Sequence, residues 1–127
     1  MEHLTVRIGQ GPYTGQATWF ARFHPEKLFS AVDRYVNEIL RVFSVLDLGL
    51  QRNGTEWLVG DKCTYADLSF VTWAQIGEGV LKEVGKDKGL TEKYPRYAAW
   101  MAKMVERPVA KKALEDIREA RKAHGLP

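Results

Sequence analysis

The sequence has only one cysteine, Cys63, among its 127 residues. A lone cysteine excludes an internal disulfide, which fits a reducing compartment, and we therefore expect a cytoplasmic protein. No apolar run approaches the ~18 residues that a membrane-spanning helix needs. The first ten residues also lack the apolar stretch of a secretory signal. These absences argue against a membrane protein and against a membrane surface as a partner.

Residues that bind metal ions or nucleic acids are also scarce or scattered. The three histidines, His3, His24 and His124, lie far apart, and the single cysteine has no partner at metal-ligand spacing. The net charge is +3, yet the 19 Lys and Arg residues are interspersed with 16 Asp and Glu and form no basic tract. The pattern predicts no metal site and no nucleic-acid partner.

What the chain does have is enough large apolar side chains for one core. Apolar residues make up 45% of the sequence and charged residues 28%, which are ordinary values for a globular protein. Four Trp, five Tyr and five Phe supply most of the bulk. With this length, one domain is expected.

The clearest local signal lies in the stretch 57–70, which reads WLVGDKCTYADLSF. Thr64 stands before an apolar run and Asp67 follows three residues later, the spacing of a capping box at a helix start. Cys63 and Leu68 occupy the two staple positions around this cap. We expect Thr64 and Asp67 to be structural cap residues that touch no substrate.

The first ten residues fit no helix. Leu4, Val6 and Ile8 alternate as in a strand, but a lone strand has nothing to pair with. We therefore expect residues 1–10 to form an irregular N-terminal segment and residues 11–127 to form a helical domain.

Apolar periodicity and breaker residues then divide the rest of the chain into about five helices. Pro25 suits the first position of the second helix, which is expected to end near Leu48–Gly49 with Gly49 or Gly54 as terminator. Ala110, Ala113, Leu114 and Ile117 are expected to form the buried stripe of the last helix. The predicted fold class is all-α, a helical bundle, with helices at 13–23, 25–48, 64 onward past 76, 95–106 and 108 onward.

Several motifs, in order and at family spacing, resemble the C-terminal domain of glutathione transferases. The central helix start resembles it through WLVGDK and ADLSF on either side of the cap. Further stretches are similar to the Ure2p-like transferases of fungi and their bacterial Nu-class relatives: GPYTGQATWF, HPEKL, AVDRYVNEILRVFSVLD and YPRYAAWMAKMVERPV. The resemblance covers Gly11 to about Leu114.

This resemblance implies the hydrophobic co-substrate half of a glutathione-dependent transferase or disulfide-bond oxidoreductase. Glutathione would be the co-substrate, and a hydrophobic small molecule or glutathione disulfide the partner. In the family a thioredoxin-like domain precedes this one and activates the glutathione thiolate. Residues 1–10 are too few to be that domain, so no catalytic residue is expected on this chain. Whether the sequence is a fragment, a truncated product or a natural single-domain relative stays open.

A second interpretation is a non-catalytic scaffold or protein-interaction module. Transferase-like C-terminal domains also occur in elongation-factor subunits, in synthetase complexes and in a fungal nitrogen regulator. In full-length relatives the first two helices face both the partner subunit and the preceding domain. Without that domain, apolar surface around Trp19, Phe20 and Phe23 would be exposed, so a two-fold homodimer is expected. The alternative is that the N-terminal segment folds back and covers this surface.

The resemblance also indicates which residues would bind substrates. Trp19, Phe20, Phe23 and Trp73 would line an apolar pocket, with Gln16 as its polar group. The alternatives are that the aromatic stripe belongs to the core and that Gln16 is an exposed or capping amide.

Functional and structural interpretations are also possible for the charged residues and the cysteine. Arg34 resembles an arginine that reaches glutathione across the domain boundary. Its planar guanidinium can bind both oxygens of a carboxylate. The alternative is that Arg34 forms a surface or structural ion pair. Cys63 is expected to be a core residue rather than a nucleophile. Three acids are interpreted as solvated helix-face charges: Asp33, Glu38 and Asp47.

Overall fold

The chain folds into a bundle of α-helices in the computed structural model, which describes the backbone of residues 2–126 and the side chains of residues 9–126. The described part contains six α-helices, one π-helical turn and no strand. The predicted all-α fold is confirmed. The elements are α1 (Glu2–Thr18), the π-helical turn η1 (Trp19–Phe23), α2 (Phe29–Asn53), α3 (Tyr65–Glu83), α4 (Leu90–Lys93), α5 (Pro95–Glu106) and α6 (Pro108–Ala123).

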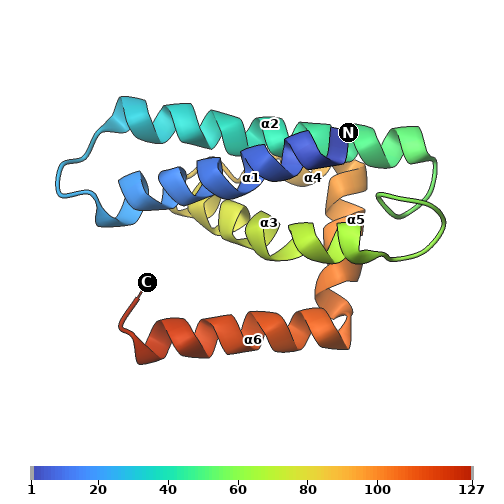
Figure 1. Cartoon of the computed structure of the whole chain (residues 1–127). Coiled ribbons are helices and arrows are strands. Elements are labelled where there is room, and N and C mark those ends of the chain that lie inside the picture. Colours follow the sequence, from blue (N-terminus) through green and yellow to red (C-terminus); the bar gives the residue numbers. More distant parts are fainter. Residues whose placement is uncertain (1, 127) are drawn as a thin grey trace.

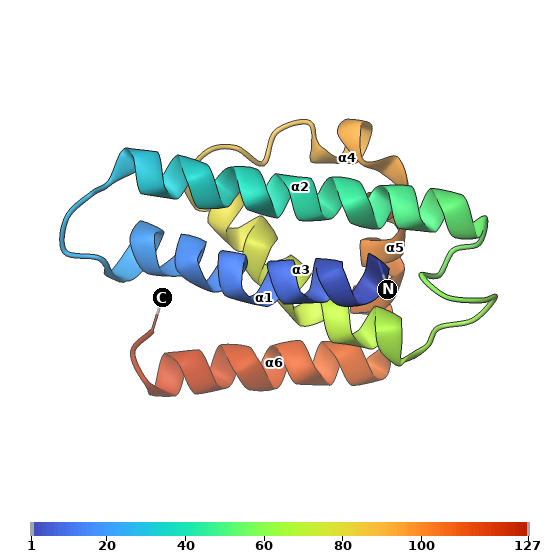
Figure 2. The ribbon, with the colours of Figure 1, turned by 45° about the horizontal axis from the view of Figure 1, so that its top comes forward.

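Three long helices, α1, α2 and α3, lie together (Figure 1). α1 and α2 run antiparallel side by side, and α3 packs against both (Figure 2). α5 crosses the end of this group, and α6 then runs back along the side opposite α2. α3 contacts α1, α2, α5 and α6, so it is the central helix, as predicted. Its largest fully buried partners in the core include Phe43, Tyr97 and Trp100.

The expectation of an irregular segment at residues 1–10 is wrong, because the backbone there already belongs to α1. Gln10 is 1% exposed and donates from Nε2 to the backbone oxygen of Phe70 at 3.3 Å. Gly11 lies against the indole of Trp73, where an added Cβ would meet Cε2 at 3.8 Å. These contacts hold the middle of α1 against α3, and residue alternation along the chain does not reveal them.

The second helix begins later than predicted, at Phe29 rather than at Pro25. His24 ends the preceding segment as expected, since its ψ of 131° is extended. Its ring nitrogen Nδ1 then accepts the backbone N–H of Glu26 at 3.1 Å. This local turn around Pro25 keeps the next residues out of the helix.

The same helix also ends later than predicted, at Asn53, so the expected end near Leu48–Gly49 is wrong. Gly54 has a φ of 70°, and of the two predicted terminators it is the correct one. The Asn53 side-chain amide donates to the backbone oxygens of Trp57 and Gly60, at 2.8 Å each. One side chain therefore closes the loop that leads to α3.

The predicted capping box is present at the start of α3. The Asp67 carboxylate is fully buried, and its Oδ2 accepts the Thr64 backbone N–H at 3.0 Å. Its Oδ1 accepts the Leu58 backbone N–H at 3.0 Å and the indole N–H of Trp100 at 2.8 Å. Asp67 thus joins the preceding loop and α5 to the helix that it caps.

Pro95 and Pro108 occupy the first turns of α5 and α6, as predicted. Asp47 on α2 is half-buried and accepts the Tyr97 backbone N–H at 2.9 Å. The interpretation of Asp47 as a solvated charge is therefore wrong, because it satisfies a free N–H in the first turn of α5. Asp33 and Glu38 do form ion pairs on the surface, with Lys86 and Arg41.

The predicted buried stripe of α6 is mostly wrong. Ala110 is buried, whereas Leu114 and Ile117 are half-buried and Ala113 is exposed. α6 meets α5 at its first turn and has only sparse contact with α3 beyond it. The far part of its apolar face consequently has little to pack against.

Replacing the cap residues tests this arrangement. We predict that Asp67→Ala lowers the free energy of unfolding by about 3 kcal/mol or more, because three N–H donors, two of them buried, lose their acceptor. Thr64→Ala is expected to cost about 1 kcal/mol, and the double variant less than the sum. Urea denaturation of the three variants measures these losses.

Asp61→Ala is the matched control, because Asp61 is exposed in the same loop. Its expected change is within about 0.5 kcal/mol. Additive losses from Thr64 and Asp67, or an Asp67 loss no larger than that of Asp61, would show that the network does not hold the fold.

Candidate functional site

Four residues form the exposed face of α1 and η1: Pro12, Gln16, Trp19 and Phe23, which we call the α1 stripe. Their spacing of four, three and four residues places them on one side of a helix. Trp19 is 49% exposed and Phe23 is 41% exposed. The stripe is thus an apolar surface to which no described part of the chain is docked.

The π-helical turn shapes the aromatic end of this stripe. The backbone N–H of His24 donates to the oxygen of Trp19, five residues earlier, at 2.9 Å. The wider turn leaves the rings of Trp19 and Phe23 stacked, with centroids 6.1 Å apart and an interplanar angle of 26°. π-Helical turns are uncommon and recur at functional sites, so this turn favours a functional role for the Trp19–Phe23 end of the stripe.

The other two predicted aromatic residues pack between helices instead. Phe20 is half-buried and stacks on Tyr35 of α2, with centroids 5.7 Å apart. Trp73 on α3 is also half-buried and lies beside Gly11. The structure therefore brings three of the five predicted pocket residues together on the α1 stripe. Phe20 and Trp73 lie off it, in packing positions.

Arg34, the predicted glutathione contact, is exposed on α2. It precedes Tyr35, whose ring lies against Phe20. Among residues 9–126 no hydrogen bond or ion pair of Arg34 is present. Its guanidinium is accordingly available to a ligand that approaches this part of α2.

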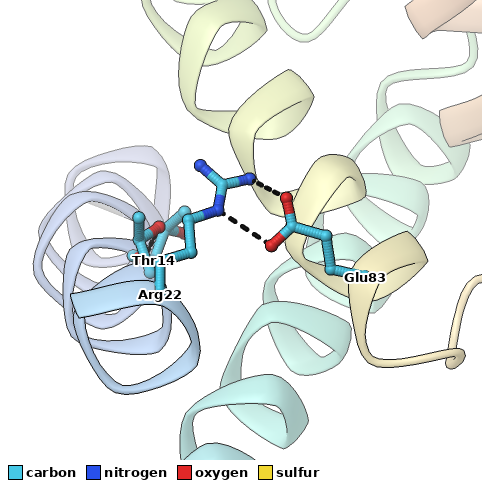
Figure 3. A network of polar contacts seen from close by, with 4 residues as sticks. Thr14, Arg22 and Glu83 are labelled. Carbon is cyan, nitrogen blue, oxygen red and sulfur yellow. Dashed lines mark hydrogen bonds and ion pairs between the residues drawn. The ribbon is translucent and has the colours of Figure 1, made fainter. Parts of the chain in front are cut away.

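An ion pair that sequence reasoning missed fixes the end of the stripe (Figure 3). Arg22 of η1 donates to both carboxylate oxygens of Glu83 at the end of α3, at 2.8 Å and 2.5 Å. The Arg22 side chain is only 10% exposed. The partners are 61 residues apart in the sequence, so no local sequence pattern predicts that they pair.

This ion pair also borders a cavity of about 400 Å³ between α3 and α6. Ile76, Ile117 and Leu126 give it apolar walls, and Arg118 and Arg121 add positive charge. The cavity lies under the sparsely packed part of α6. An apolar body with an acidic group would suit its lining.

Cys63 shows none of the features of an activated nucleophile. Its Sγ lies 3.9 Å from the Sδ of Met104, in contact with the core. Burial raises the pKa of the Cys63 thiol, an effect that Arg107 opposes and Asp67 reinforces. Because a reactive thiol needs a lowered pKa, these surroundings favour the structural role.

The described residues contain neither a metal-binding cluster nor a membrane-spanning helix. They include no group of three or more His, Cys, Asp and Glu side chains placed to hold a metal ion. None of their helices combines the length and the apolar character that a membrane span requires.

Comparisons with known proteins agree with this geometry. Residues 11–108 match the family model of the glutathione S-transferase C-terminal domain. The glutathione S-transferase-like protein tpcF of Aspergillus fumigatus is 43% identical over 115 residues, which are 86% of this chain and 50% of that protein.

Solved structures give the same result. The glutathione transferase URE2P8 of Phanerochaete chrysosporium, solved with oxidized glutathione, superposes with a TM-score of 0.80 at 41% identity, over 95% of this chain and 54% of that one. Ure2p in complex with glutathione superposes with a TM-score of 0.70 at 35% identity, over 84% and 47%. The chain spans about half the length of these relatives. It belongs to the glutathione S-transferase family and contains that family's C-terminal helical domain.

Proposed function

We propose that this domain is the half of a cytoplasmic glutathione-dependent transferase or disulfide-bond oxidoreductase that binds the hydrophobic co-substrate. The α1 stripe is the observation that carries the proposal. Co-substrate sites are mostly apolar and aromatic, with a few polar groups that set orientation. Trp19 and Phe23 supply the aromatic surface, and Gln16 supplies one amide beside it.

Glutathione itself is held partly by Arg34 in this proposal. The solved relatives bind glutathione or its oxidized form, as their names state. An exposed guanidinium on α2 can bind both oxygens of a carboxylate. Phe20 and Trp73 support the site indirectly. Phe20 packs against α2 and Trp73 packs against α1, and both contacts fix the helical segment that carries the stripe.

The chemistry is divided between the two halves of such a protein. Glutathione supplies the thiolate, and a thioredoxin-like half activates it. The thiolate sulfur then attacks an electrophilic carbon or a disulfide sulfur, and the leaving group departs with the electron pair. The α1 stripe binds the electrophile beside that sulfur and excludes water, which raises the rate through proximity.

Joining this domain to the first half of a relative tests the proposal. We predict that the 127-residue chain alone does not conjugate glutathione to chlorodinitrobenzene. A chimera with the N-terminal half of the Phanerochaete chrysosporium enzyme is expected to do so. In the chimera, Trp19→Ala should raise KM for the electrophile by roughly tenfold, because buried aromatic contact is lost. Arg34→Ala should raise KM for glutathione instead.

Tyr65→Ala is the control, since Tyr65 is 83% exposed at the start of α3, away from the α1 stripe. It should leave both constants unchanged. A folded chimera without activity, or one indifferent to Trp19 and Arg34, contradicts the transferase role and favours a scaffold. Turnover by the chain alone would contradict the division between halves.

We also propose that the 127-residue chain by itself, with no thioredoxin-like half and no electrophile over the α1 stripe, forms a homodimer through α1 and α2. Contiguous exposed apolar surface is uncommon on monomers and tends to find a partner, most often with two-fold symmetry. We predict a dimer at micromolar concentration by light scattering, and a monomer when Trp19→Glu and Phe23→Glu are combined. Tyr65→Glu should remain dimeric. A native chain that scatters as a monomer would contradict the proposal.

A further inference from the structure

A further concave site, which no residue of α1 lines, lies along α3. It is a groove of about 670 Å³ bounded by α3, by α5 and by the segment that contains α4. Leu90, Met101 and Val105 form its apolar walls. No residue of the α1 stripe lines it, and nothing in the proposed transferase function uses it.

The groove contains a carboxylate that the fold holds in place. Glu78 of α3 is half-buried, and its Oε1 accepts a hydrogen bond from the Tyr97 hydroxyl, with an oxygen–oxygen distance of 2.8 Å. Tyr97 is itself 2% exposed and stacks on Phe43, so the donor is rigid. Burial raises the pKa of Glu78, and the hydrogen bond from Tyr97 partly offsets that rise. A cation beside Glu78 would relieve this cost of burial.

Gln75 provides a second acceptor one helical turn before Glu78. Its side chain lines both this groove and the cavity between α3 and α6, and its Oε1 is shielded from solvent without any hydrogen-bond partner. Buried carbonyl oxygens are nearly always paired in folded proteins, because an unpaired one costs free energy. A ligand that brings N–H donors into the groove would satisfy it.

The remaining charges leave the groove slightly acidic. Asp87 lies on the loop side and Lys82 one turn beyond Glu78, both on its lining. Lys82 is exposed, and among the ion pairs of residues 9–126 none joins it to Glu78. The two carboxylates therefore outnumber the one cation, and both are less exposed than Lys82.

We propose that this groove binds an organic cation with an apolar body, such as an aryl-alkyl amine. Glu78 and Gln75 accept the N–H donors of the ammonium group. The apolar body lies against Leu90, Met101 and Val105. A charge-assisted hydrogen bond to a held carboxylate gives the site its preference for a cation over a neutral molecule of the same shape.

Three naphthyl probes of matched size test this proposal on the folded chain. They are naphthylmethylamine, the neutral naphthylmethanol and the anionic naphthoate. Chemical-shift changes in two-dimensional NMR spectra report both the affinity and the place of binding. We expect the amine to bind at least about tenfold more tightly than the alcohol, with shifts on α3 and α5.

Variants separate the groove from general charge effects. Glu78→Gln keeps an acceptor for Tyr97, so it should fold, yet it should remove the preference for the amine. Gln75→Leu should weaken amine binding, and Lys82→Gln should strengthen it by removing a like charge. Glu119→Gln is the control, because Glu119 is exposed on α6 and removes the same charge elsewhere.

The outcomes decide the proposal. Amine binding that depends on Glu78 and not on Glu119 supports it. Equal binding of all three probes, tighter binding of naphthoate, shifts confined to other helices, or no binding overturns it. None of these results depends on transferase activity, so the groove and the proposed function fail separately.

Discussion

The Asp67 carboxylate is the constraint on which the rest of the structure depends. A fully buried charge is unfavourable unless hydrogen bonds replace its water, and Asp67 receives donors from three separate places. The Thr64 N–H begins α3, the Leu58 N–H comes from the loop, and the Trp100 indole comes from α5. The same carboxylate therefore caps α3 and joins it to the loop and to α5. The position of α5, and with it that of α6, follows from this acceptor.

The second constraint is the difference between the two faces of α1, one buried and one exposed. Its inner face carries Gln10, Thr14 and Ala17, which are buried, and small residues that let α3 come close. Its outer face carries the α1 stripe, whose aromatic rings are left exposed. The Arg22–Glu83 ion pair ties the end of this helix to α3, so the exposed rings are presented by a fixed element.

Local signals explain what the sequence could predict. The capping box at Thr64, the proline starts at Pro95 and Pro108, and the Gly54 terminator each act within a few residues, and the structure confirms them. Family resemblance favoured surface positions for Trp19 and Phe20, where periodicity alone allowed a core interpretation; Trp19 is exposed, whereas Phe20 packs against Tyr35.

Contacts between distant segments explain what it could not. Gln10 in the middle of α1 is bonded to α3, and Asp47 accepts the Tyr97 N–H of α5, 50 residues away. Arg22 and Glu83 are 61 residues apart, and Glu78 meets Tyr97 across two helices. Charge and polarity mark these residues in the sequence, but only the fold shows which of them are paired. The late start of α2 is different, because a local turn at His24 overrides the proline signal.

Hydrogen exchange at the Trp100 indole tests the central claim most directly. If Asp67 ties α3, the loop and α5 into one unit, the Trp100 Nε1–H should exchange only when the whole domain unfolds. Its opening free energy, measured by NMR with increasing urea, should then equal that of the core amides of α3. An indole proton that exchanges much faster than those amides, through local opening, would contradict the account.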